Sequence, residues 1–222
     1  MLSCGWDEFA YLEFMKDKIS DKPFLMDVGA NIGDFTTAFL QKYPEGMIYA
    51  FEPIKDIYSR LEKRFVYNEN VHCFNFGLSD KEENNRTIYY VKNSEGMSSL
   101  HYRPAYFPKF QVEERKVDLT TLDIIRDTLP SVDLLKIDVE GSEKQVFNGG
   151  LLFLKETPPK FIQFEVGECY IDSHSTFKEV VDLLYSFNYK IYNKNFNLIT
   201  PENVWENYDC QNYLAVFQNE YE

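Results

Sequence analysis

The stretch that decides the fold is Phe24-Leu25-Met26-Asp27-Val28-Gly29-Ala30-Asn31-Ile32-Gly33, near the start of the chain. Its first five residues form a short, mostly apolar run after Pro23, which predicts a buried strand. Residues 34–43 follow as a predicted helix that ends at Pro44. Glycines in such a turn let a ligand approach the backbone, and the free N–H groups of the next helix favour a carboxylate. The stretch therefore predicts a strand–turn–helix unit that binds a ligand.

An acid at the end of the next strand narrows the kind of ligand. That strand is predicted over residues 47–51 and ends at Glu52, about 20 residues beyond the turn, where an acid accepts hydrogen bonds from ribose hydroxyls. A dinucleotide fingerprint needs Gly-x-Gly-x-x-Gly, but Asn31 and Asp34 occupy its second and third glycine positions. The pattern favours a nucleoside with an amino acid tail and a positive centre, and Asp27 is the acid expected to bind the ammonium.

Short apolar runs alternate with amphipathic stretches along the rest of the chain, which predicts βαβ units and a mainly parallel sheet. Further strands are expected at 71–76, 86–91, 113–117, 133–139 and 160–166, and helices at 7–19, 54–67, 120–129, 142–147 and 177–187. Ser142 is the expected N-cap of its helix. The last two strands, 189–192 and 213–217, have no helix between them, so they are expected to pair antiparallel.

Composition limits the class of protein. The 222 residues suit one domain, and 36 acidic against 23 basic residues give a formal charge of −13. Such a surface repels phosphate backbones, so we expect no nucleic acid partner. No run approaches the roughly 18 apolar residues of a membrane span. The four scattered cysteines and the lack of a signal-peptide pattern predict reduced thiols in a cytoplasmic protein.

The sequence resembles the FkbM family of methyltransferases. The resemblance runs in family order over roughly residues 22–167, and its most specific part is Lys136-Ile137-Asp138-Val139-Glu140-Gly141-Ser142-Glu143. The other matching segments are residues 27–36 around the glycine turn, Tyr49-Ala50-Phe51-Glu52-Pro53, Asn75-Phe76-Gly77-Leu78-Ser79-Asp80, Ser98-Ser99-Leu100 and Phe164-Glu165-Val166.

The resemblance implies an α/β, Rossmann-like class I methyltransferase fold. Its sheet would have seven strands in the order 3-2-1-4-5-7-6, with helices on both sides and the last strand antiparallel. It also implies S-adenosylmethionine as methyl donor, S-adenosylhomocysteine as product, and a hydroxyl group of a sugar, glycan or small metabolite as acceptor. The residues expected to bind the cofactor are Asp27, Gly29, Ala30, Asn31, Gly33, Phe51, Glu52, Pro53, Asn75, Gly77, Leu78 and Asp138.

Carboxylates at the ends of two later strands are the candidates for the chemistry. Methyl transfer is an in-line displacement, and a hydroxyl nucleophile gains from a positioned base. Asp138 and Glu140 follow the fourth core strand, Glu165 ends the fifth, and His101 lies in a loop between them and the cofactor turn. The three acids offer oxygen ligands, so a divalent metal bound by Asp138, Glu140 and Glu165 is the alternative.

Two nearby charged residues have simpler interpretations. Glu143 is expected to make capping and loop hydrogen bonds, and Lys136 to form a buried ion pair with a neighbouring acid. The predicted domain has an N-terminal helix (1–20), a cofactor-binding core (22–167), an acceptor-side insertion (81–117) and a C-terminal helix and hairpin (168–222). Residues 102–108, rich in aromatics, are expected either to cover a sugar or to pack as a surface loop.

Three other functions remain open from the sequence. The same fold could methylate nitrogen or a carboxylate, or bind a nucleoside without catalysis. The chain could also be one domain of a larger glycan-modifying enzyme.

Overall fold

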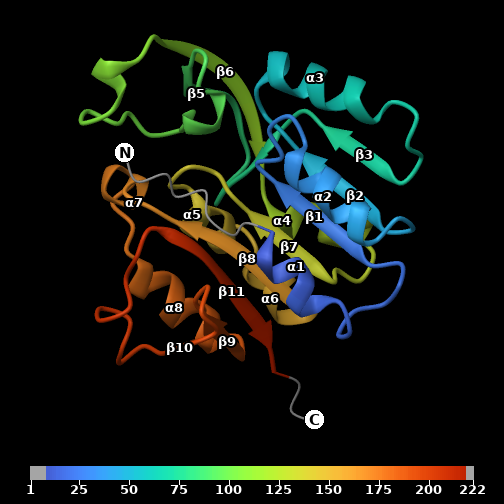
Figure 1. Ribbon diagram of the computed structural model, residues 1–222. Helices are drawn as coiled ribbons and strands as arrows, with labels where there is room; N and C mark the ends of the chain where they lie inside the picture. Colours follow the sequence, from blue (N-terminus) through green and yellow to red (C-terminus); the bar gives the residue numbers. More distant parts are fainter. Residues whose placement is uncertain (1–8, 219–222) are drawn as a thin grey trace.

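A computed structural model describes residues 9–218 as a mixed sheet with helices on both faces (Figure 1). Within that range the main sheet has eight strands in the order β10-β9-β11-β8-β7-β1-β2-β3. The strands are β1 (Phe24–Val28), β2 (Met47–Phe51), β3 (Val71–Phe74), β7 (Leu134–Ile137), β8 (Phe161–Val166), β9 (Tyr189–Tyr192), β10 (Leu198–Ile199) and β11 (Gln211–Phe217).

The expected strand order is confirmed, with one addition. Without β10, the observed sequence of strands is the predicted 3-2-1-4-5-7-6, and β11 runs antiparallel to both β8 and β9. The two-residue β10 pairs with β9 at the edge, so the sheet has eight strands rather than seven. The sequence analysis missed β10 because a strand of two residues shows no periodicity.

The register of the parallel strands places the site. Val28 of β1 pairs with Phe51 of β2 and with Ile137 of β7, and Ile137 pairs with Phe164 of β8. Since these strands run in the same direction and end at the same level, the residues after them meet at one edge of the sheet.

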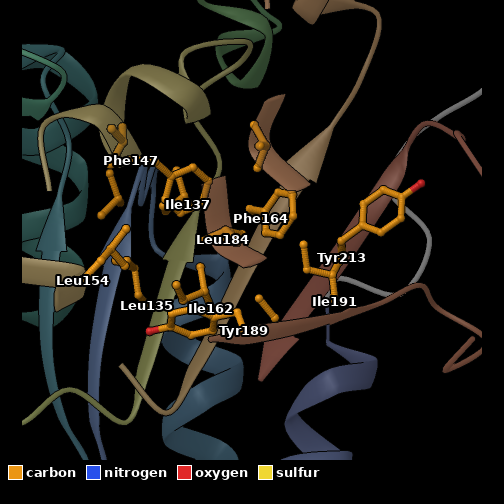
Figure 2. Packing of buried hydrophobic residues seen from close by; sticks show 14 of the residues in the cluster. Leu135, Ile137, Phe147, Leu154, Ile162, Phe164, Leu184, Tyr189, Ile191 and Tyr213 are labelled. Carbon is orange, nitrogen blue, oxygen red and sulfur yellow. The ribbon is translucent and has the colours of Figure 1, made fainter. Parts of the chain in front are cut away.

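Two helical layers cover the faces of the sheet. One face packs against α1 (Ala10–Met15), α2 (Asp34–Lys42) and α3 (Lys55–Phe65). The other packs against α4 (Leu122–Ile125), α5 (Glu143–Asn148), α6 (Leu151–Glu156) and α8 (Phe177–Ser186). In Figure 2, side chains from α5, α6 and α8 surround those of β7, β8, β9 and β11. These two apolar layers hold the sheet edge rigid.

Several expected helices have different bounds. The helix expected at 7–19 is α1 alone, with residues 7 and 8 outside the described range. The helix expected at 120–129 divides into α4 and a 3₁₀ turn, η3 (Arg126–Thr128). The helical stretch ends before Leu129, which has an extended backbone because the next residue is Pro130. The short helices α6 and α7 (Cys169–Asp172) were not predicted, because four to six residues give too few turns to show a pattern.

Residues 77–120 build a second sheet at the end of the main one (upper left in Figure 1). Its strands are β4 (Gly77–Leu78), β5 (Glu83–Val91) and β6 (Val112–Thr120), and the loop between β5 and β6 holds the 3₁₀ turns η1 (Glu95–Met97) and η2 (Phe107–Lys109). The two long strands, β5 and β6, pair antiparallel. Apolar side chains of this sheet pack on Ile54 and Ile57, which attaches the insertion beside β2.

Candidate active site

A cavity lies where the ends of β1, β2 and β7 face the insertion. Three groups of residues line it. The turn after β1 and the start of α2 contribute Val28, Gly29, Ala30, Asn31, Ile32, Asp34 and Phe35. The ends of β2 and β7 contribute Glu52, Pro53, Ile54, Ile57, Lys136, Asp138, Val139, Glu140 and Ser142. The second sheet contributes Gly77, Leu78, Ile88, Glu95, Gly96, Ser98, Leu100 and Leu119.

The glycine turn depends on backbone geometry that other residues resist. Gly29 has φ +78° and Gly33, the N-cap of α2, has φ +86°. The N–H groups of Gly29 and Ala30 both donate to the carbonyl of Phe51, at 3.1 and 3.0 Å. A side chain at Gly29 would overlap the carbonyl oxygen of Asp138. The turn is therefore fixed against β2 and β7 by its backbone, with its open side on the cavity.

Glu52 is held at the cavity wall by two backbone donors. Its Oε2 accepts from the N–H of Asn31 at 3.1 Å, and its Oε1 accepts from the N–H of Ile54 at 2.8 Å. Burial raises the pKa of this carboxyl to about 7, against the lowering effect of the two backbone hydrogen bonds. Each carboxylate oxygen keeps an unused lone pair, which suits a diol that donates two hydrogen bonds.

Asp27, the acid expected to bind an ammonium, has partners within the protein. The residue is fully buried, its Oδ2 accepts from Thr36 Oγ1 at 2.7 Å, and Lys136 Nζ lies 3.4 Å from Oδ1. It does not belong to the cavity lining, and its contact with an ammonium stays a prediction. Lys136 also lies 3.5 Å from Asp138 Oδ2, and the buried ion pair expected for this lysine is confirmed.

Three other expected cofactor residues support the cavity from outside its wall. Phe51 is buried and stacks on Phe74, and Gly33 packs against side chains of α3. The amide of Asn75 donates to the carbonyls of Glu52 and Pro53, both at 3.0 Å. The remaining expected residues line the cavity directly: Gly29, Ala30, Asn31, Glu52, Pro53, Gly77, Leu78 and Asp138.

One side of the cavity is apolar. It is formed by side chains from the start of α3 and from the second sheet: Ile54, Ile57, Leu78, Ile88 and Leu119. Glycine at position 77 allows Leu119 to pack closely against β4, because a Cβ at this position would lie 2.8 Å from Leu119 Cδ2. A flat aromatic ring would fit such a wall, and Glu52 lines the same cavity.

Comparison with known families identifies the fold and the class of enzyme. A family model described as the methyltransferase FkbM domain matches residues 27–191. The chain belongs to the FkbM methyltransferase family. The enzyme is an S-adenosylmethionine-dependent methyltransferase of class I, as the sequence predicted.

Two curated relatives are similar over most of their length. Methyltransferase sdnD of Sordaria araneosa is 28% identical over 180 residues, covering 64% of this chain and 68% of the relative. The 2-O-methyltransferase NoeI of Sinorhizobium fredii is 26% identical over 182 residues, covering 74% and 72%. At this identity the relatives support the family and leave the acceptor of this FkbM enzyme to be proposed.

Solved structures agree on the fold. An FkbM methyltransferase from Methylobacillus flagellatus superposes with a TM-score of 0.57 at 15% identity, and the match covers 90% of this chain but only 44% of that one. A putative rRNA methylase from Clostridium thermocellum reaches a TM-score of 0.51 at 7% identity. A protein described as an rRNA methylase shares this fold, so the fold does not by itself exclude nucleic acid as an acceptor.

Two of the four expected catalytic residues of this FkbM enzyme line the cavity. Asp138 and Glu140 follow β7, where Glu140 has φ +53°. Arg103 Nη1 of the insertion donates to Glu140 Oε2 at 2.8 Å, and Arg103 Nε lies 3.6 Å from Asp172 Oδ2. Burial and the charge of Asp138 raise the pKa of Glu140 to about 8, although Arg103 opposes this shift.

The third expected acid, Glu165, lies beside Asp138 behind the cavity wall. Its pKa is well above the usual range, mainly because of burial and then because of the charges of Asp138 and Glu140. Glu143 is fully buried, and its carboxylate accepts from the N–H groups of Val139 and Gly141, so the expected loop hydrogen bonds are confirmed. Burial raises the pKa of Glu143 to about 7.

The acids that come together differ from the expected metal set. Oxygen atoms of Asp138, Glu143 and Glu165 all lie within 4.8 Å of one another, whereas Glu140 turns its carboxylate to Arg103. Glu140 is therefore not part of this cluster of oxygen atoms. Its left-handed backbone conformation, which the sequence does not reveal, directs it to the insertion.

His101, the fourth expected catalytic residue, does not line the cavity itself but contacts the hydroxyl of Ser142, which does. Its Nε2 lies 3.1 Å from Oγ of Ser142, which lines the cavity. Ser142 is the N-cap of α5 by position, but among the described contacts its side chain makes no capping hydrogen bond. The expected capping role is therefore wrong for the side chain, which contacts His101 instead.

Sequence reasoning missed Arg103 as a site residue. Residues 102–108 were expected either to cover a sugar or to pack as a surface loop, whereas the Arg103 side chain is 6% exposed and connects the insertion to Glu140 and Asp172. The sequence around Arg103 does not predict that this side chain is buried, because its partners Glu140 and Asp172 lie 37 and 69 residues away in sequence.

Proposed function

We propose that this enzyme transfers the methyl group of S-adenosylmethionine to a hydroxyl group of a small molecule, with a sugar as the first acceptor to test. The observation that carries the proposal is the position of Asp138 and Glu140. They line the same cavity as the glycine turn and Glu52, so hydrogen-bond acceptors for a hydroxyl adjoin the cofactor wall.

Each part of the cofactor has a matching wall. In this proposal Glu52 accepts hydrogen bonds from the ribose hydroxyls, and the apolar wall of Ile54, Leu78 and Ile88 packs on adenine. The turn from Gly29 to Asn31 surrounds the amino acid end. The cofactor supplies an electrophilic methyl group on a positively charged sulfur. The chain aligns the acceptor with it and keeps water out, which supplies several kcal/mol of rate enhancement.

Asp138 and Glu140 orient the acceptor. Lys136 and Arg103 hold the two carboxylates in place, at 3.5 and 2.8 Å. A hydroxyl that donates a hydrogen bond to Asp138 or to Glu140 has its lone pairs directed away from that carboxylate, where the donor methyl group can approach.

A sugar or other small metabolite is favoured over nucleic acid by charge. The net charge of −13 opposes a phosphate backbone, and the acids of the site add to this repulsion. One relative, NoeI, is named as a 2-O-methyltransferase, which also favours oxygen as the accepting atom. Among residues 9–218 no helix is long and apolar enough to cross a membrane. The described cysteines Cys73, Cys169 and Cys210 are free thiols, which supports a cytoplasmic location in this proposal.

Calorimetric titration tests the cofactor site first. We expect the parent protein to bind S-adenosylmethionine and S-adenosylhomocysteine, and Glu52→Ala to bind both about 10- to 100-fold more weakly, since two charge-assisted hydrogen bonds are lost. Glu69→Ala, at an exposed site in the loop before β3, is the matched control. Equal affinity in Glu52→Ala would contradict the ribose assignment.

A transfer assay tests the acceptor. S-adenosylmethionine labelled with ¹³C in its methyl group is supplied with neutral monosaccharides, their methyl glycosides and glucosamine, and the product is identified by NMR. An O-methyl product supports the proposal, while an N-methyl product from glucosamine alone would contradict it.

A metal-assisted arrangement is the second candidate, favoured by the meeting of Asp138, Glu143 and Glu165. It is tested in the same assay by adding a chelator and then Mg²⁺ or Mn²⁺. Activity that disappears and returns with the ion would assign these oxygen atoms to a cation.

A further inference from the structure

We propose that Ser142 and His101 form a proton path out of the cavity. The hydroxyl of Ser142 accepts the proton of the acceptor and passes its own to Nε2 of His101. The inference rests on the proposed function, because only a hydroxyl acceptor has a proton that must leave during methyl transfer.

The geometry of the pair supports a path between the two side chains. Ser142 is 1% exposed and lines the cavity, and its Oγ lies 3.1 Å from Nε2 of His101 on the insertion. The backbone N–H of His101 donates to Ser99 Oγ at 3.2 Å, and Ser99 Oγ donates to the carbonyl of Glu140 at 2.7 Å. These contacts fix the imidazole against the turn that holds the orienting acids.

Charged groups from several elements also act on His101. Arg86 of β5, Asp172 at the end of α7 and His174 beyond it all act on the ring electrostatically. Burial lowers the pKa of His101, and Arg86 lowers it further, while Asp172 opposes the shift. The ring is only partly buried, so a proton that reaches it can continue to solvent.

The acids of the site are less suited to removing the proton. Glu140 is paired with Arg103, Asp138 with Lys136, and Glu143 with two backbone N–H groups. Arg103 and the backbone donors only oppose the burial that raises the pKa of Glu140 to about 8 and that of Glu143 to about 7, so at neutral pH these two groups already hold a proton for much of the time. A neutral imidazole can accept the proton, and the charge of Asp172 favours the imidazolium that results.

The transfer balances as one displacement. The acceptor oxygen forms a bond to the methyl carbon, and the sulfur–methyl bond breaks with its electron pair returning to sulfur. The acceptor O–H proton moves to Ser142 Oγ while the Ser142 proton moves to His101 Nε2. The resulting imidazolium then loses its proton to solvent, which restores the pair.

NMR of the protein labelled with ¹⁵N-histidine tests the direction of the hydrogen bond without an acceptor. The chain has three histidines, and His101→Gln assigns the signal. With S-adenosylhomocysteine bound, we expect His101 to be neutral at pH 7.5 with its proton on Nδ1. Ser142→Ala should shift the Nε2 resonance of His101 and leave that of His72 on β3 unchanged. A proton on Nε2, or a charged ring at this pH, would overturn the inference.

Kinetics test the path in turnover, with methyl transfer to the monosaccharides named above. We expect Ser142→Ala and His101→Gln each to lower kcat about 100-fold with little change in the KM for S-adenosylmethionine. The double variant should be no slower than the slower single one, because both residues act in one step. Added imidazole should restore part of the activity of His101→Ala, which a purely structural role would not allow. His72→Gln is the control.

The two proposals fail in different ways. A parent protein that binds no S-adenosylmethionine contradicts the proposed function. A parent that binds and transfers methyl groups, with Ser142→Ala and His101→Gln at parental kcat, contradicts the proton path alone.

Discussion

The cofactor side and the acceptor side of the cavity are built in different ways. The cofactor side is held by backbone groups, such as the N–H groups of Asn31 and Ile54, which donate to Glu52 from 21 and 2 residues away in sequence. The acceptor side is held by side chains that are distant in sequence, such as Arg103 with Glu140 and His101 with Ser142. The first depends on the register of the main sheet, and the second depends on how the insertion docks. Substitutions should therefore affect the two sides differently.

The largest expected effect is on the cofactor side, for Gly29→Ala. A side chain at φ +78° is strained, and its Cβ would overlap the carbonyl of Asp138. Together these should cost about 4 kcal/mol of unfolding free energy, measured by urea denaturation. Gly96→Ala is the control, because its Cβ would meet only Asn31 Nδ2 at 3.5 Å and should change stability by less than about 0.5 kcal/mol. Equal losses in both variants would contradict the assignment of strain to the turn after β1.

The next effect separates two arginines of the insertion. Arg103→Met leaves Glu140 and Asp172 without their buried partner, and should cost about 3 kcal/mol. Arg115→Met also removes two ion pairs, with Asp56 and Glu113, but at a side chain 39% exposed, so it should cost less than about 1 kcal/mol. Chemical denaturation of both variants checks the ranking, and a reversed order would show that the acceptor side does not depend on Arg103.

The pH dependence of stability tests the cofactor side again. Because the pKa of Glu52 is about 7 in the folded protein and near 4.5 when unfolded, the folded state binds the extra proton. The stability this carboxyl contributes is thus complete at low pH and is lost as pH rises through 7. The difference in unfolding free energy between Glu52→Gln and the parent should change by about 2 to 3 kcal/mol from pH 5 to pH 8. Parallel pH profiles of the two proteins would contradict the shift.

The smallest expected effect is that of Asn75→Ala. It removes two donors that hold the carbonyls of Glu52 and Pro53 but leaves the cavity wall in place. The affinity for S-adenosylhomocysteine should fall only about fivefold, corresponding to about 1 kcal/mol. Calorimetry beside Glu52→Ala provides the comparison, and an equal loss would place Asn75 in direct contact with the ligand.

The same contrast explains what the sequence could predict. The strand order, the glycine turn and the location of Glu52 follow from local patterns, because strand, turn and helix here are consecutive in the chain. The packing of Asp27 did not follow from the sequence, because an acid in a strand can face either the cavity or the layer of α2, and its partners here are Thr36 and Lys136. The contacts of Arg103, Ser142 and Glu140 depend on how the insertion packs against the main sheet. No local sequence pattern predicts that packing.

The two ends of the insertion are tied together. Gly77 and Leu78 of β4 pair with Leu119 and Thr120 of β6, and the N–H of Ser79 donates to the carbonyl of Thr120 at 2.9 Å. A segment whose ends are already joined can change in length at little entropic cost to the rest of the chain. We therefore expect residues 80–118 to tolerate changes in length between β4 and β6, provided that Ile88, which lines the cavity beside Leu78, is kept.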